Sequence, residues 1–380
     1  MARIGRSLLV AGLVIALPVA GAALSGASFE ELLAFPPRPV KADPAAFSWV
    51  VFGVILAAVV LVAGPFVLRV ARSRARPAPP AGRFPRWGWA AAGLILAAWV
   101  AAWGGLGGSA LAQRHAFTPL WLGYIGLVNA LTQWRAGTCL PVRRPGLFLG
   151  LFPLSAGFWW LFEHLNRFTH NWYYVGIGDQ GDWTYFWLAT PAFATVLPAV
   201  LGTRDLLTTF PGLSAGLDRG WALPLPSRQI LTVAALGGGG LALLAIGWRG
   251  EWFFPLLWVG PLLLLWGLQA RAGEPTLLGP AAAGNWRPFW LAALAALVCG
   301  FFWELWNSGS LAHWEYAIPY AGRFHLFEMP ILGYAGYLPF GPECVTAALL
   351  VLGPRPELLY GPAVPLSERS GGVSGEPAPG

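Results

Sequence analysis

The stretch from Gly157 to Pro198 contains, in order, Phe158-Trp159-Trp160, Glu163-x-x-Asn166, Trp172-Tyr173-Tyr174 and Leu197-Pro198. About 140 residues later, the stretch from Gly300 to Pro339 contains Phe301-Phe302-Trp303, Glu304-x-x-Asn307, Trp314-Glu315-Tyr316 and Leu338-Pro339. Each stretch puts a carboxyl and an amide side chain on one helical face near the end of a long apolar segment. The recurrence predicts a duplicated unit that carries polar groups into a lipid setting.

The composition is that of an integral membrane protein. Of the 380 residues, 56% are hydrophobic, 11% are charged and 22 are tryptophan, which is too little charge to cover a soluble body of this length. We predict an all-α polytopic helix bundle of ten transmembrane segments, each able to cross about 30 Å of hydrocarbon. The predicted segments are 7–26, 47–68, 87–106, 117–134, 146–165, 184–202, 229–247, 252–270, 288–306 and 326–352.

The positions of the arginines predict the orientation. With the N-terminus inside, 18 of the 24 basic residues fall on the cytoplasmic side, where such residues are retained. We therefore expect both termini to be cytoplasmic, in a bacterial-type inner membrane. Topology and the anionic inner leaflet account for the net charge of +7, so membrane lipid is the expected partner and nucleic acid is not.

The segments fall into a simple predicted organisation. Residues 1–70 form an N-terminal transmembrane hairpin, 71–86 an Arg/Pro-rich cytoplasmic linker, 87–202 and 229–352 two membrane repeats, and 353–380 a disordered cytoplasmic tail. Each repeat is a four-helix unit with an even number of spans, so the copies are parallel and related by an axis along the membrane normal. A cleaved signal peptide is the alternative interpretation of the first segment, although its length favours an uncleaved helix.

The chemically capable residues concentrate at the predicted outer side, where all five histidines fall. The candidate catalytic residues are Glu163, Glu304, Glu328, His164, His313 and His325. The candidate substrate-binding residues are Asn166, Asn307, Trp172, Trp183, Trp314, Tyr316 and Glu343. Like each Glu-x-x-Asn pair, His325 and Glu328 are spaced i, i+3, which puts both members on one helical face and suits general acid and base chemistry.

The paired glutamates have a structural alternative. Glu163 and Glu304 stand near helix ends, where a carboxylate can extend to the interface among belt tryptophans and tyrosines. The recurrence of each glutamate with its asparagine favours a functional role.

Glu343 lies deeper, inside the last segment, where an unpaired carboxylate costs about 2.5 to 3.5 kcal/mol. It must face protein or water, or be protonated. The prolines and glycines of this segment predict that it is not one straight helix, and that a broken helix lines a cavity. The alternative is a kinked packing helix in which Glu343 bonds to a neighbour.

No metal is predicted, although the histidines and carboxylates suit Zn, Fe or Cu by ligand type. The sequence has no His-Glu-x-x-His, Glu-x-x-His or paired-cysteine spacing, and the cofactor therefore stays open. The Pro342-Glu343 and Glu328-Met329-Pro330 runs resemble polytopic carotenoid-processing enzymes such as lycopene cyclases, which also combine tandem helical repeats with acids beside proline. No residue role is carried over from them.

Three functions remain open at this point. The favoured one is an outward-facing intramembrane site that binds or processes a lipid or isoprenoid-like molecule with paired carboxylates. The alternatives are a secondary transporter built from two repeats, and a structural or assembly subunit of a membrane complex. The favoured site follows from the crowding of polar groups at the outer rim, because transporters usually bind near mid-bilayer. The substrate, the reaction and the oligomeric state are not predicted.

Overall fold

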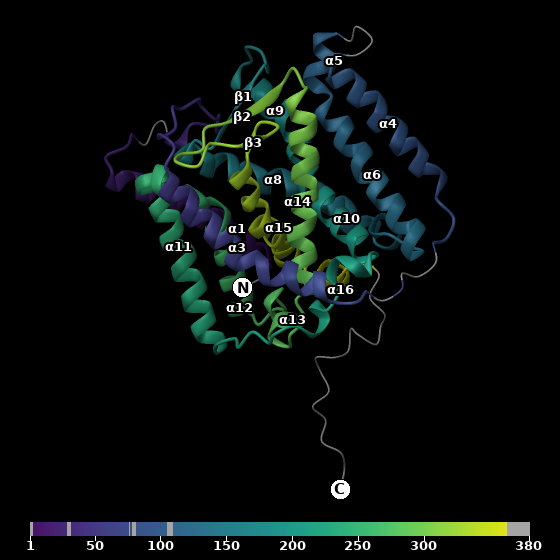
Figure 1. Ribbon diagram of the computed structural model, residues 1–380. Helices are drawn as coiled ribbons and strands as arrows, with labels where there is room; N and C mark the ends of the chain where they lie inside the picture. Colours follow the sequence, from purple (N-terminus) through teal and green to yellow (C-terminus); the bar gives the residue numbers. More distant parts are fainter. Residues whose placement is uncertain (1–2, 29–31, 76, 78–80, 105–108, 363–380) are drawn as a thin grey trace.

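A computed structural model describes residues 3–28, 32–75, 77, 81–104 and 109–362 (Figure 1). The α-helices are α1 (Arg3–Leu24), α3 (Trp49–Arg72), α4 (Arg86–Ala102), α5 (Ala110–His115), α6 (Phe117–Ala136), α7 (Leu140–Arg143), α8 (Pro145–Thr169), α9 (Asp182–Phe193), α10 (Val196–Thr208), α11 (Arg228–Phe253), α12 (Gly260–Ala272), α13 (Leu278–Ala282), α14 (Arg287–Ser308), α15 (Tyr337–Leu352) and α16 (Pro356–Tyr360). The 3-10 helices are η2 (Pro211–Ser214), η3 (Leu217–Arg219), η4 (Phe254–Trp258) and η5 (Ile331–Gly336). The strands are β1 (Trp172–Val175), β2 (His313–Tyr316), β3 (His325–Leu326) and β4 (Met329–Pro330).

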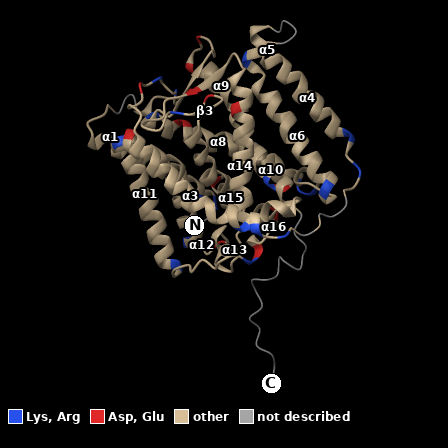
Figure 2. Cartoon of the chain, in the orientation of Figure 1, with Lys and Arg blue, Asp and Glu red and all other residues tan. Residues whose placement is uncertain are grey.

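The architecture is that of a helical membrane protein. Within the described residues, 7 helices are long and apolar enough to cross a membrane. The helix α3 shows the lipid-like environment best, because only 6% of its apolar window is buried and Val50 and Leu61 are about three-quarters exposed. Figure 2 shows the charged residues mainly near the ends of the long helices and in the loops between them.

Three of the ten predicted segments are not among these seven. Segment 87–106 forms α4, which is apolar but shorter, and segment 117–134 forms α6, whose hydropathy Asn129 and Thr132 reduce. Segment 252–270 forms η4 and the 13-residue α12, after α11 breaks at Arg249. The number of spans therefore stays a prediction.

Small residues let the central helices approach closely. A Cβ atom added at Gly341 of α15 would lie 1.9 Å from the carbonyl oxygen of Ala292 in α14. One added at Gly247 of α11 would lie 1.9 Å from the carbonyl oxygen of Pro18 in α1. Helices without a hydrophobic drive between them gain their contact energy from such close packing. The helix α14 thereby lies against α15 and α10 in the middle of the bundle (Figure 1).

The last predicted segment, 326–352, is not a single helix. It begins as a hairpin, in which His325 pairs with Pro330 and Leu326 with Met329, and it continues through η5 into α15. The prediction of a broken segment is confirmed. The expectation that His325 and Glu328 share a helical face is wrong, because a tight turn rather than a helix joins β3 to β4, with Phe327 at a φ of 57°.

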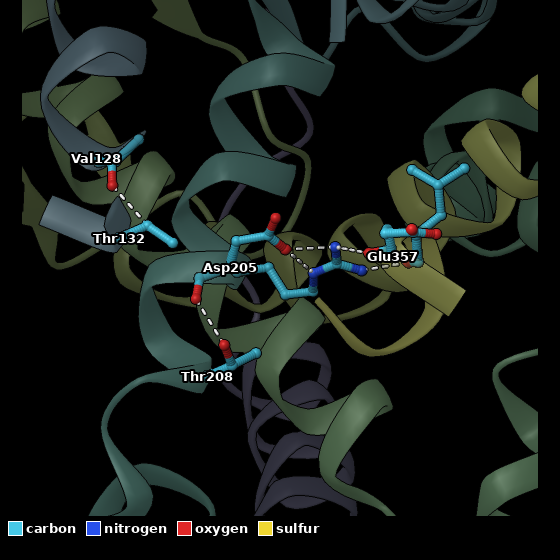
Figure 3. A network of polar contacts seen from close by, with 7 residues as sticks. Val128, Thr132, Asp205, Thr208 and Glu357 are labelled. Atoms are coloured by element: carbon cyan, nitrogen blue, oxygen red, sulfur yellow. Dashed lines mark hydrogen bonds and ion pairs between the residues drawn. The ribbon is translucent and has the colours of Figure 1, made fainter. Parts of the chain in front are cut away.

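A buried ion pair fixes the chain near its C-terminal end (Figure 3). Arg204 is 1% exposed and donates to Asp205 Oδ1 from Nε at 3.0 Å and from Nη2 at 2.5 Å. Its guanidinium also donates to the carbonyl oxygens of Leu358 and Glu357, the latter at 3.0 Å. Burial acts to raise the pKa of Glu357, but its own backbone amide and the guanidinium groups of Arg144 and Arg143 lower it below its usual value.

These contacts correct the predicted boundary of the disordered tail. Residues 356–360 are helical, and Leu358 is fully buried among the other core side chains. The sequence pattern misses this because glycines and prolines flank a helix of only 5 residues. Residues 363–380 of the predicted tail lie outside the described residues.

The close crossing of α14 and α15 generates a stability prediction. Gly341→Ala should lower the free energy of unfolding by about 1 to 3 kcal/mol, because the methyl group meets backbone rather than a movable side chain. Gly237→Ala in α11 is the control, because an added Cβ there meets nothing within 4 Å. Thermal unfolding in detergent measures both variants. Equal melting temperatures would contradict the assigned helix contact.

Candidate functional site

The C-terminal end of α8 carries Glu163, and Asn166 fixes the chain that follows it. The helix ends at His170, whose φ of 50° lies in the left-handed region. The Asn166 Nδ2 atom donates to the carbonyl oxygen of Trp172 at 2.8 Å, and its Oδ1 accepts the backbone N–H groups of Asn171 and Trp172 at 2.7 and 3.3 Å. Asn166 thus holds β1 against the end of α8.

Glu163 is 1% exposed, and one of its oxygens is saturated with donors. Its Oε1 accepts hydrogen bonds from Trp159 Nε1 at 2.9 Å, Trp172 Nε1 at 3.2 Å and Tyr174 Oη at 2.6 Å. Burial and the Glu163 carboxyl raise the pKa of Tyr174 well above its usual value, so this hydroxyl keeps its proton and donates. The other oxygen, Oε2, is buried without a hydrogen-bond partner among the described residues, so the donors satisfy one of the two carboxyl oxygens.

Glu304 at the end of α14 has a corresponding environment. It is fully buried, and its Oε1 accepts from Tyr316 Oη at 2.6 Å, Tyr337 Oη at 3.2 Å and Trp314 Nε1 at 3.4 Å. Asn307 Nδ2 donates to the carbonyl oxygen of Trp314 at 2.7 Å, and Asn307 Oδ1 accepts the backbone N–H of Trp314 at 2.8 Å. Both Glu-x-x-Asn motifs therefore make the same kinds of contact with the Trp-x-Tyr strand that follows.

The two strands pair with each other at the end of the bundle where α8 and α14 terminate (Figure 1). The antiparallel register joins Trp172 to Tyr316, Tyr173 to Glu315 and Tyr174 to Trp314. The tryptophan of each strand therefore lies opposite the tyrosine of the other strand that donates to a glutamate. At the central pair, the Tyr173 hydroxyl donates to Glu315 Oε2. This hydrogen bond lowers the pKa of Glu315, although burial acts in the opposite direction. The strand pair links the two motifs and covers the space between them.

The third donor to each carboxyl group comes from a different position in the two stretches. The spacing that relates the two glutamates also relates Trp159 to Gly300 and Val196 to Tyr337. Trp159 is the third donor in the first stretch, whereas Tyr337 is the third donor in the second. A Cβ atom at Gly300 would lie 2.2 Å from the Tyr337 ring, so the large and small residues have changed places. Each site keeps three donors, but the two sites are not identical in shape.

Between the motifs lies a cavity of about 190 Å³. A single ordered water needs about 10 to 15 Å³ by the same measure, so the space suits a larger molecule. The donors to both carboxyl groups line it, and most of the remaining wall is apolar. The lining residues are Arg114, His115, Phe117, Trp159, Trp172, Tyr174, Ile177, Gln180, Tyr185, Leu188, Ala189, Ala192, Phe193, Val196, Trp258, Trp303, Ala312, His313, Trp314, Tyr316, Met329, Gly333, Gly336 and Tyr337.

The structure brings some of the predicted site residues to this cavity. The lining includes Trp172, Trp314, Tyr316 and His313. Glu163 and Glu304 do not line it but accept hydrogen bonds from lining residues. The two asparagines fix the strands and do not line the cavity.

Other predicted residues lie elsewhere. His164 approaches the carbonyl oxygen of Ile15 in α1 at 3.2 Å, Trp183 is 65% exposed, and His325 is exposed on its hairpin. Glu328 is half-buried in the turn of that hairpin and does not line the cavity. Glu343 is fully buried in α15, and neither of its carboxyl oxygens has a hydrogen-bond partner among the described residues.

Several cavity residues are absent from the predicted site. Trp159 and Tyr174 belong to the sequence motifs quoted at the start. Tyr174 and Tyr316 each follow a tryptophan by two residues, and this match could have identified Tyr174 as the counterpart of Tyr316. Tyr185 and Trp258 have no such signal, because they enter the cavity from α9 and η4, outside the motif.

The described residues contain no group of three or more His, Cys, Asp or Glu side chains that could hold a metal ion. Comparisons of the chain with protein-family models, with curated proteins and with solved structures gave no match. The site is therefore interpreted from its own geometry.

The asparagine contacts predict a structural effect. Asn307→Ala removes both hydrogen bonds to the Trp314 backbone and should destabilise the protein by about 1 to 3 kcal/mol per buried group left unpaired. Ser308→Ala is the neighbouring control, because its hydroxyl bond to Leu305 is exposed and its loss should cost less than about 0.5 kcal/mol. Thermal unfolding compares the two. An Asn307 variant as stable as the Ser308 variant would exclude a strand-fixing role.

Proposed function

We propose that the protein binds a lipid-like or isoprenoid-like molecule in the cavity between its two Glu-x-x-Asn motifs. The observation that carries the proposal is a single cavity whose aromatic walls are hydrogen-bonded to both buried carboxyl groups. Binding sites for small apolar molecules are commonly concave, mostly apolar and equipped with a few polar groups that fix orientation.

The carboxyl groups act in this proposal chiefly as positioning groups. Glu163 and Glu304 are at most 1% exposed and do not line the cavity, so a bound molecule meets their indole and phenol donors first. Acid or base chemistry would have to pass through a phenol, such as that of Tyr316, to reach the molecule. Binding is therefore the better supported function, and processing of the bound molecule is a further step.

Access from the bilayer is supported by the position of α9. Leu188 of α9 lines the cavity, whereas the adjacent Trp187 is 66% exposed and does not line it, so α9 separates the cavity from the protein surface. An apolar molecule dissolved in lipid can reach such a wall without crossing water.

The proposal includes the finer topology predicted from the sequence. Ten spans, two parallel repeats, cytoplasmic termini and a bacterial-type inner membrane would put the cavity at the extracytoplasmic side. The matched contacts of the two motifs support a duplication, because unrelated helix ends need not repeat a glutamate, an asparagine, a tryptophan and a tyrosine in the same roles.

A carrier is the second candidate function, and Glu343 is the observation that favours it. Its fully buried carboxyl group lies in α15, away from the cavity lining, and lacks hydrogen-bond partners among the described residues. Buried intramembrane carboxyl groups commonly belong to transport pathways. A carrier would move the cavity ligand across a proteoliposome, whereas a one-sided binding protein would not.

The binding proposal predicts a retained molecule. Native mass spectrometry of protein released from nanodiscs should find one lipid-like adduct per chain, and Ala192→Trp should remove it by filling the cavity. Thr184→Trp is the matched control, because Thr184 is an exposed residue of the same helix that does not line the cavity. An adduct that survives Ala192→Trp lies elsewhere, and a clean apo mass in the unchanged protein contradicts the proposal.

The topology predicts the side on which each loop lies. A reporter fused after Arg76 should be active in the cytoplasm, and one inserted after Gly178, beside the cavity mouth, should be active outside it. The expectation follows from the excess of arginine on the predicted inner side. An extracytoplasmic signal after Arg76 would reverse the orientation.

A further inference from the structure

The polar part of the cavity wall is unlike the rest of its lining. It consists of Arg114 and His115 at the end of α5, His313 at the start of β2, and Gln180 and Tyr185 near α9. All of these side chains can donate hydrogen bonds, the histidines in either protonation state. No aspartate or glutamate belongs to the lining among the described residues.

Two of these donors, Arg114 and Tyr185, keep hydrogen-bonding capacity that the described residues do not use. Arg114 donates from Nε to the carbonyl oxygen of Gly176 at 3.2 Å, which fixes the guanidinium group, and it makes no ion pair within the described part of the chain. The Tyr185 hydroxyl is buried, belongs to a residue only 5% exposed, and has no hydrogen-bond partner among the described residues. A buried donor without a partner costs about 1 to 3 kcal/mol, which a polar ligand group would recover.

One carboxylate approaches this region from outside the cavity. Glu315 Oε1 lies 3.5 Å from His313 Nε2, while Glu315 Oε2 accepts the Tyr173 hydroxyl. Glu315 does not line the cavity. The other ring nitrogen of His313, Nδ1, lies 3.2 Å from the carbonyl oxygen of Leu311. Both ring nitrogens of His313 therefore face acceptors within the protein, and His313 contributes to the cavity wall without a nitrogen left for a ligand.

On these observations we propose that the cavity ligand is a phosphate-bearing lipid, whose headgroup binds Arg114 and His115 while its apolar chain lies between the tryptophans. The inference rests on the proposed binding function and names its substrate class. The guanidinium group of arginine can bond two oxygens of a phosphate group, and the adjacent His115 imidazole can donate to a third oxygen, which a carboxylate does not have. The Tyr185 hydroxyl donates to a polar atom next to the headgroup.

The geometry also explains why both ends of the cavity are needed. Moving the apolar chain from lipid to the aromatic walls changes its free energy little, because lipid is equally apolar. Selection among lipids must therefore come from the polar wall. A charge-assisted contact is worth about 1.5 to 3 kcal/mol, or about tenfold or more in affinity.

The test compares two probes on the full chain in nanodiscs of zwitterionic lipid: a radiolabelled C15 isoprenoid monophosphate and the corresponding alcohol. The unchanged protein should bind the monophosphate at least about tenfold more tightly than the alcohol. Arg114→Gln should remove that difference and leave the affinity for the alcohol unchanged. Arg323→Gln is the control, because Arg323 carries an outer charge that stacks on Phe47 and does not line the cavity.

The outcomes separate this inference from the proposed function. Equal binding of alcohol and monophosphate, or an equal loss in the Arg114 and Arg323 variants, overturns the headgroup assignment and leaves the apolar cavity standing. Binding of neither probe overturns both. Inorganic phosphate that binds as tightly as the isoprenoid monophosphate would contradict a lipid as the source of the phosphate group. Tyr185→Phe should weaken monophosphate binding without lowering the melting temperature, because its hydroxyl has no partner to lose within the described residues.

Discussion

A buried carboxyl oxygen that accepts three hydrogen bonds is the interaction on which the cavity end of the molecule depends. Glu163 and Glu304 each bring an acid out of contact with water, and such a group requires donors from the protein itself. The tryptophan and tyrosine that donate to each acid belong to the strand that follows its helix. Satisfying the acid therefore also positions the strand, and the two strands then pair over the space between the helices.

This arrangement makes the cavity a consequence of the donor shells. The rings that donate to the carboxyl groups turn their apolar faces inward, and indole and phenol groups can serve both purposes at once. The exchange of Trp159 and Val196 for Gly300 and Tyr337 keeps three donors at each acid while it changes the shape of the two halves. Two similar donor shells thus border a cavity whose halves differ in shape.

At the opposite end of the bundle, a buried charged group likewise requires hydrogen-bond partners from the protein, and here the group is an arginine. Arg204 is buried, and its guanidinium is satisfied by Asp205 and by backbone carbonyl groups at the end of the chain. Removing one partner of such a pair would leave a buried charge, so the contact holds α16 in place. The two ends differ in the space they enclose: Arg204 borders a cavity of only about 20 Å³, whereas the donors to Glu163 and Glu304 line a cavity of about 190 Å³.

The sequence by itself determined the helical membrane character, because 56% hydrophobic and 11% charged residues leave no soluble alternative. It also identified Glu163, Glu304 and their asparagines as a recurring unit, since a repeated spacing is visible without a fold.

The sequence could not predict which groups donate hydrogen bonds to those carboxyl groups, nor that Trp159 and Tyr337 provide the third donor from different positions. Nor could it distinguish the His325–Leu326 hairpin from a helix, because an i, i+3 spacing is meaningful only once the backbone is known to be helical. Tertiary structure alone decided the cavity, the pairing of β1 with β2 and the presence of Arg114, Tyr185 and His313 in one cavity wall. The residue pattern of a segment indicates which surroundings that segment requires. Contacts between distant segments depend instead on how all the helices pack together.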